Sequence, residues 1–274
     1  MAMASPPALP PVFPLLGAAS FCTFSTRYAI APLVSVFIAA QQGYTTAQKT
    51  FLLSAFFPGY VASMVPGGVL AQAVGGKAVF SAILWGHALF AALIPAAVRR
   101  GPGTLWACLC AIGLCQGPLF GAQKKVQAAW LPQDGPERAR ALMVVNMGSK
   151  LSGPVTNVLV PLLAGSRFGW RSVTTIYASV TMAFAVLWQL LVTETPPSDI
   201  TTSSDDAPTP AVSTAIEWRV FIVPAVWGPL LMHLAENTSM YAIMQSKPPP
   251  QSSAVSDPWV VSDRLLALCL QCLR

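Results

Sequence analysis

Residues 51–79 read FLLSAFFPGYVASMVPGGVLAQAVGGKAV, and this stretch indicates the fold class most clearly. It contains no charged residue before Lys77, and a helix needs about 20 apolar residues to cross a hydrocarbon core. Gly75, Gly76 and Lys77 form a short basic turn before the next apolar run begins. The sequence therefore predicts a segment that crosses a bilayer, turns and crosses back.

The composition of the whole chain indicates the same class of protein. Of its 274 residues, 54% are apolar and 9% are charged, whereas ordinary soluble domains carry roughly 25% charged residues. The net charge of +6 is scattered between the apolar runs, so a nucleic-acid partner is not indicated. We predict an all-α, multi-pass integral membrane protein whose partner is the lipid bilayer, in the plasma membrane or an organelle.

Seven apolar runs are long enough to span a membrane, and they define the expected domains. We expect these spans near residues 13–38, 50–71, 78–98, 104–129, 141–165, 171–192 and 218–244. The first six would form a bundle over residues 13–193, after a Pro-rich, disordered stretch at residues 1–12. A flexible polar linker at residues 194–216 would lead to a seventh transmembrane helix at residues 217–245 and a divergent tail at residues 246–274.

Ionisable side chains inside the spans are the first candidates for a transport path, because each costs on the order of 2.5–3.5 kcal/mol at mid-bilayer. Arg27 lies in the middle of the first span. Its guanidinium either binds an anion in a watery cavity with two N–H groups, or pairs with a carboxylate of another helix. We favour anion binding. Lys150 in the fifth span has the same two interpretations, whereas His87 in the third is expected to make only a helix–helix hydrogen bond.

A cluster of polar residues marks the seventh span. His233, Asn237 and Tyr241 follow one another at intervals of four residues, so that they share one face of a helix. A polar face on a membrane helix typically lines a cavity, which makes His233 and Asn237 candidates for substrate binding. Glu236 is a candidate for carrying a coupling proton, because a carboxyl group in an apolar site can exchange protons near neutral pH.

The fourth span carries a ridge of glycines. Gly113, Gly117 and Gly121 form two overlapping G-x-x-x-G units, which predict close approach to another helix. Gln116 lies beside this ridge, and Pro118 should loosen the helix and free backbone groups that a cavity can solvate. The sequence contains no nucleophile elbow, phosphate-binding loop or metal-ligand cluster, so neither an enzyme activity nor a metal site is predicted.

Several of these segments follow a pattern known from one family of membrane proteins. The span around Arg27 and residues 56–79 resemble the first two helices of the anion:cation symporter family of the major facilitator superfamily. That family includes sodium–phosphate cotransporters, sialin, vesicular glutamate transporters and plant organellar phosphate transporters. Further matching segments are residues 113–132, 137–141, 169–173, 194–196 and 226–241.

The resemblance implies a secondary transporter of organic or inorganic anions, coupled to H⁺ or Na⁺ and requiring no other cofactor. Two six-helix halves would close alternately over a site at the membrane midplane, and this chain would supply one half plus the seventh helix. Together with the polar side chains inside the spans, the resemblance gives Glu236 as the coupling candidate and a substrate-binding set of Arg27, Tyr60, Gln116, Lys150, His233 and Asn237.

The chain departs from the family at positions that carry charge. The fourth helix of the family commonly has an Arg and, seven residues later, a Glu; this chain has Leu109 and Gln116. Gln72 and Ala73 replace an acidic and a basic residue before the Gly pair. Two hypotheses remain: a transporter, either cut short by gene prediction or assembled with a second half-transporter chain, and a degenerate half that acts only by binding other membrane proteins. A seven-helix receptor rests on the helix count alone.

Overall fold

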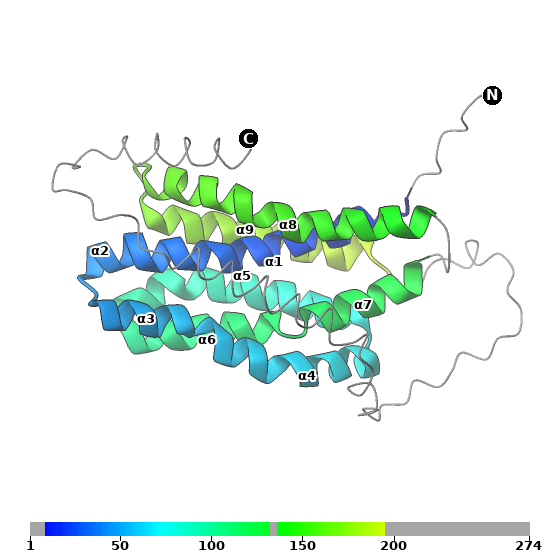
Figure 1. Ribbon diagram of the computed structural model, residues 1–274, viewed down its shortest axis with the longest axis horizontal. Coiled ribbons are helices and arrows are strands. Elements are labelled where there is room, and N and C mark those ends of the chain that lie inside the picture. Colours follow the sequence, from blue (N-terminus) through cyan, green and yellow to red (C-terminus); the bar gives the residue numbers. More distant parts are fainter. Residues whose placement is uncertain (1–8, 132–135, 195–274) are drawn as a thin grey trace, which may run out of the picture. The chain divides into compact units, whose positions relative to one another are not determined.

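The computed structural model describes residues 9–131 and 136–194, and in these ranges the chain folds into helices without a strand (Figure 1). The elements are α1 (Val12–Pro32), the π-helical η1 (Leu33–Ile38), α2 (Ala39–Gln42), α3 (Thr46–Ser54), α4 (Phe56–Val74), α5 (Gly76–Arg100), α6 (Pro102–Gln116), α7 (Leu119–Trp130), α8 (Pro136–Ala164) and α9 (Trp170–Leu191). The expected all-α class is confirmed. The seventh expected span, the linker and the tail lie outside the described residues.

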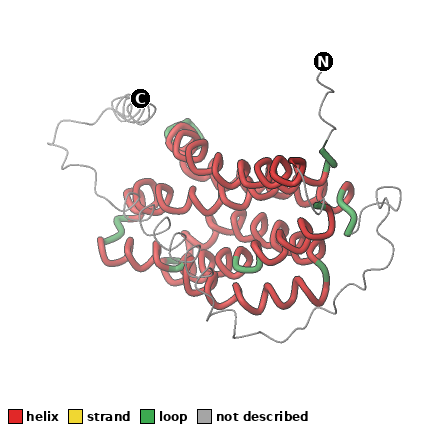
Figure 2. The backbone as a smooth tube through the Cα atoms, turned by 45° about the vertical axis from the view of Figure 1, so that its right-hand side comes forward, coloured by secondary structure: helices red, strands yellow, loops and turns green. Residues whose placement is uncertain are grey.

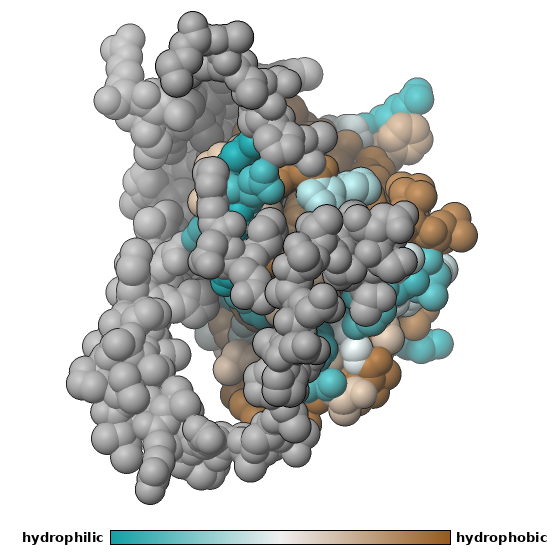
Figure 3. Space-filling view, turned by 90° about the vertical axis from the view of Figure 1, so that its right-hand side faces the viewer, coloured by the Kyte–Doolittle hydropathy of each residue, from teal (hydrophilic) through white to brown (hydrophobic). Residues whose placement is uncertain are grey.

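Apolar runs without charge become helices of membrane length. Within the described ranges, five stretches are long and apolar enough to cross a membrane: Val12–Gln42, Thr46–Val74, Gly76–Arg100, Pro102–Trp130 and Trp170–Leu191. The α8 helix has 29 residues and is also long enough, but side chains such as Asn146 and Lys150 make it more polar. Large hydrophobic side chains are exposed mainly on α4, α8 and α9, as expected for a membrane-facing surface. Figure 3, which looks at the right-hand end of Figure 1, shows hydrophilic side chains (teal) beside hydrophobic ones (brown).

Prolines interrupt three of these membrane-length stretches. A proline lacks a backbone N–H and cannot bond to the carbonyl group four residues earlier. Pro58 lies four residues after Ser54, the residue at which α3 ends. Pro118 separates α6 from α7, as the sequence predicted. After Pro32 the chain continues as the π-helical η1. Such breaks free backbone groups inside a bundle, where neighbouring helices or water must satisfy them.

The long helical stretches pack in four principal pairs. α1 lies along α8, α4 along α6 and α7, α5 along α9, and α5 also along α6 and α7; Figure 2 shows the described helices (red) joined by short loops (green). If the long helical stretches are counted in chain order, the first packs on the fifth, the second on the fourth, and the third on both the fourth and the sixth.

Glycines let α4 and α6 approach each other closely, as the overlapping G-x-x-x-G units predicted. A methyl carbon added at Gly113 would collide with the Phe56 carbonyl oxygen. One added at Gly117 would lie 2.6 Å from the Tyr60 carbonyl oxygen, and Gly121 faces the backbone of α4 in the same way. The close contact fixes the position of the α4 turn that carries Phe56 and Tyr60.

A carboxylate at the end of α9 caps the beginning of α5. Glu194 Oε1 accepts a hydrogen bond from the Gly76 backbone N–H (2.7 Å), and Oε2 accepts one from the Lys77 backbone N–H (3.0 Å). The Trp188 indole N–H donates to the Lys77 carbonyl oxygen (3.3 Å). A negative charge at a helix N-terminus satisfies unpaired N–H groups and interacts favourably with the helix dipole. The cap thus joins the turn before α5 to the end of α9.

We predict that Gly113→Ala lowers the free energy of unfolding by about 1–3 kcal/mol, because the added methyl group forces α6 away from α4. The measurement is denaturant unfolding of the purified chain in detergent, followed by circular dichroism. Gly103→Ala is the matched control, since Gly103 lies on the same helix and a methyl group there would meet open space. Equal effects of the two substitutions would contradict the close helix contact.

We also predict that Glu194→Ala lowers the free energy of unfolding by about 1 kcal/mol, the usual value of a helix cap. Lys77→Ala keeps its backbone N–H and should leave stability unchanged in the same assay. If Lys77→Ala were as damaging as Glu194→Ala, the contact would depend on an ion pair between side chains and not on the cap.

Candidate functional site

Arg27 lies in α1, at the middle of the membrane-length stretch Val12–Gln42, and is half-buried against two aromatic rings of α4. Its guanidinium carbon is 4.8 Å from the centroid of the Phe56 ring and 5.3 Å from that of the Tyr60 ring. The two rings stack on each other, with centroids 5.5 Å apart and planes inclined by 23°. Aromatic faces attract a cation, and the planar N–H groups of a guanidinium match the geometry of a carboxylate or phosphate.

The contact between α4 and α6 holds these rings in place. Phe56 and Tyr60 are four residues apart and therefore lie on one face of α4, and their backbone packs on Gly113 and Gly117. The sequence identified Arg27 and Tyr60 as candidates but missed Phe56 as a partner of the cation. The signal that could have found it is the spacing of two aromatic residues by one helical turn.

The buried polar side chains without a hydrogen-bond partner in the described ranges are those of Ser25, His87, Gln116 and Gln127, of which His87 and Gln116 are the most deeply buried. Gln116, at the end of α6, has neither amide atom bonded, and His87, in α5, has neither ring nitrogen bonded. The helix–helix hydrogen bond expected for His87 is therefore not found among the described residues. Because buried polar groups are nearly always hydrogen-bonded, both side chains are candidates for contact with water or a ligand.

Lys150 lies at a different level of the bundle from Arg27. α8 crosses α1 where Gly148 packs against Gly17. Along α8, Lys150 lies two residues after Gly148, and along α1, Arg27 lies ten residues after Gly17. Their distances from the crossing therefore differ by about 12 Å along the helix axes. Lys150 is exposed on α8. The remaining candidates lie outside the described residues: His233, Glu236 and Asn237.

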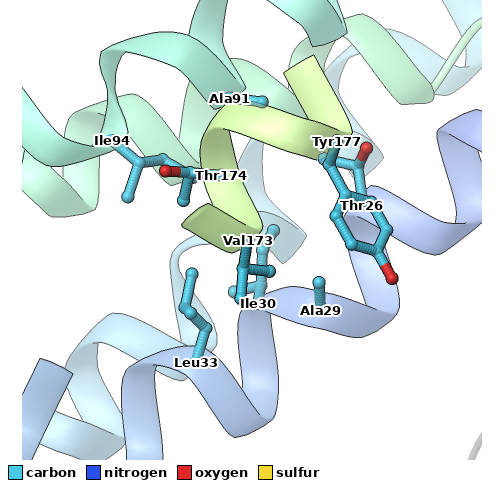
Figure 4. A pocket seen from close by; sticks show the side chains of 9 residues that line it. All are labelled: Thr26, Ala29, Ile30, Leu33, Ala91, Ile94, Val173, Thr174 and Tyr177. Carbon is cyan, nitrogen blue, oxygen red and sulfur yellow. The ribbon is translucent and has the colours of Figure 1, made fainter. Parts of the chain in front are cut away.

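A small crevice lies between α1, η1, α5 and α9 (Figure 4). Its volume of about 10 Å³ leaves room for about one water molecule. The crevice carries no cationic side chain and therefore does not provide the anion site. It is lined by Thr26, Ala29, Ile30, Leu33, Ala91, Ile94, Val173, Thr174 and Tyr177.

Comparison with known proteins gives a consistent result. The sequence profile of the Major Facilitator Superfamily matches residues 16–255. A protein of Oryza sativa subsp. japonica named probable anion transporter 4, chloroplastic, is 29% identical over 230 residues, which cover 80% of this chain and 37% of the relative.

Two proteins of Arabidopsis thaliana are similarly related. The sodium-dependent phosphate transport protein 1, chloroplastic, is 28% identical over 77% of this chain and 42% of its own length. The ascorbate transporter, chloroplastic, is 26% identical over 76% of this chain and 39% of its own length. The chain thus spans about two fifths of the length of these curated relatives.

Proposed function

Because the chain belongs to the major facilitator superfamily, we propose that it moves a small anion across a membrane by alternating access, with Arg27 as the anion-binding cation. Family membership confirms the expected multi-pass membrane protein related to anion transporters and not to enzymes. The observation that carries the proposal is the stacking of the Arg27 guanidinium on Phe56 and Tyr60 inside a membrane-length helix.

The chemistry of this arrangement suits an anion. A charge at mid-bilayer is costly, and the two aromatic faces offset part of that cost. An oxyanion bound at the edge of the Arg27 guanidinium would accept two parallel N–H hydrogen bonds and cancel the charge. Relatives are named for phosphate and for ascorbate, and we propose a substrate of this class: a small anion with oxygen atoms that accept hydrogen bonds.

We further propose that a second six-helix unit completes the site. The crevice between α1, η1, α5 and α9 has room for about one water molecule, so this crevice by itself does not hold an anion. Transporters of this superfamily place the substrate between two such units, which rock against each other. The second unit is supplied either by further residues of the same polypeptide or by a second half-transporter chain.

The second candidate function is a non-transporting membrane protein that binds other membrane proteins. It is favoured by Leu109 and Gln116, at the positions where the resemblance leads one to expect an Arg and a Glu. The Leu109 side chain packs in the hydrophobic core, and the amide of Gln116 is uncharged, so α6 adds no charge to the site. Retention of Arg27 on its aromatic platform favours transport.

We predict that proteoliposomes holding the chain together with its second six-helix unit, as one longer polypeptide or as two half-transporter chains, take up labelled phosphate or ascorbate. Arg27→Ala should reduce the initial rate at least tenfold, because the anion loses its charged hydrogen-bond donor. Arg167→Ala is the matched control: Arg167 also lies over an aromatic ring, 4.7 Å from the centroid of Phe168, but in the turn before α9. Absence of uptake of either anion by this complete, folded wild-type assembly would favour the non-transporting alternative.

We predict that Phe56→Leu raises KM for the anion about three- to tenfold, whereas Tyr60→Phe leaves it nearly unchanged. Leucine removes a cation–π contact, which contributes about 0.5–2 kcal/mol, but phenylalanine keeps the ring. Initial uptake rates at varied anion concentration give the comparison. A larger effect of Tyr60→Phe would show that the phenol hydroxyl, and not the aromatic face, contributes to binding.

A further inference from the structure

One end of the bundle carries cations from four segments of the chain but no acidic residue of the ranges that the structure describes. The turn between α8 and α9 lies at this end, together with α2 and α3 (Figure 1, left). Glu194 caps the beginning of α5 and Glu137 lies in the first turn of α8, so both described acids lie at the opposite end. We call the end without acids the basic end, and its cations are Lys49, Arg99, Arg100, Arg167 and Arg171.

The arginines of α5 and α9 lie at one level because these two helices pack antiparallel. Near the beginning of α5, the Ser81 hydroxyl donates a hydrogen bond to Gln189 Oε1 of α9 (2.8 Å). Toward the other end of the pair, Ile94 of α5 and Thr174 of α9 line the same crevice. In this register the last turn of α5 lies level with the first turn of α9. The four arginines of the basic end are exposed, so their charges are accessible from outside the bundle.

Aromatic rings lie among these cations. The Arg167 guanidinium carbon is 4.7 Å from the centroid of the Phe168 ring, and that of Arg171 is 5.7 Å from the centroid of the Trp170 ring. Phe168 is 66% exposed. Tryptophan is enriched where a membrane-spanning segment meets the lipid headgroups, and long cationic side chains reach the same level. The basic end therefore lies at the level of lipid headgroups.

An apolar stripe on the outer surface of α5 leads to the basic end. Trp85, Leu89 and Leu93 follow one another at intervals of four residues and are 42% to 52% exposed, so they share one outer face of the helix. Arg100 lies seven residues beyond Leu93, which is about two turns and returns to the same face. A stripe of this kind matches a phospholipid, whose acyl chains are apolar and whose phosphate is anionic.

We propose that the basic end binds an anionic phospholipid, with the phosphate at the arginines and an acyl chain along the α5 stripe. This inference concerns a different part of the molecule from Arg27 and does not depend on anion transport. A guanidinium can donate two parallel N–H hydrogen bonds to a phosphate. Near an anionic membrane surface, each Lys or Arg strengthens association about fivefold. Lipids with a net negative charge should therefore be preferred over zwitterionic ones.

A lipid accounts for the basic end better than a soluble anion does. A soluble anion requires cations alone and gains nothing from the exposed Phe168 ring or from the stripe between Trp85 and Leu93. A bound lipid covers this apolar surface with its acyl chains and places its phosphate at the level of the arginines. The combination of exposed cations and exposed apolar side chains on one helix pair therefore favours the lipid.

Native mass spectrometry of the full chain in detergent tests this proposal. The probes are phosphatidylglycerol, which is anionic, and phosphatidylcholine with the same acyl chains, which is zwitterionic. The wild-type chain should bind phosphatidylglycerol about tenfold more tightly than phosphatidylcholine, and the double variant Arg167→Gln/Arg171→Gln should lose most of this preference. The matched control, Lys77→Gln/Lys124→Gln, removes two cations at the opposite end, near the beginning of α5, and should leave the preference nearly unchanged. Circular dichroism checks that each variant keeps its helices.

Three results would overturn the proposal. The first is equal affinity of the wild-type chain for the two lipids. The second is an equal loss of preference in the two double variants, because the charges at either end would then act alike. The third comes from labelled inorganic phosphate: its binding should be the same in the wild-type chain and in Arg167→Gln/Arg171→Gln, and a loss in the variant would assign the basic end to a soluble anion. None of these results depends on whether the chain transports an anion.

Discussion

The low polarity of the hydrocarbon core is the constraint on which the rest of this structure depends. It requires backbone N–H and C=O groups to be hydrogen-bonded within helices, and it makes a polar side chain inside a span costly unless another group interacts with it. The described residues meet the first requirement with long helices joined by short turns. They meet the second at Arg27 by seating the guanidinium on two stacked rings.

The contact between α4 and α6 connects this packing to the site. Gly113 and Gly117 bring the two backbones together at the α4 turn that carries Phe56 and Tyr60. The position of these two rings therefore depends on α6, although α6 supplies neither of them. The same helix ends at Gln116, and its neighbouring turn packs on α5. α4 thus contacts both of its neighbours at this turn: its aromatic pair lies against Arg27 of α1, and its backbone lies against the glycines of α6.

Local sequence patterns predicted the positions of the helices and one close contact, but not which side chains meet between helices that are distant in the chain. Apolar runs gave the positions of the helices, the glycine ridge gave the close contact of α6, and Pro118 gave its break. The pairing between helices could not be read in the same way, because lipid and a neighbouring helix are equally apolar. For that reason the role of Phe56, the unbonded state of His87 among the described residues and the cap formed by Glu194, 118 residues from Gly76, emerged only from the structure.

The function proposed for this chain depends on anion binding by Arg27, and the position of a bound anion can be determined directly. The measurement is an anomalous difference map from crystals of the full chain soaked with selenate, a tetrahedral oxyanion with the shape of phosphate. We predict a selenium peak within hydrogen-bond distance of the Arg27 guanidinium, beside the Phe56 and Tyr60 rings. Selenium found only at surface cations, such as Arg99 and Arg100 in the last turn of α5, would contradict the assignment.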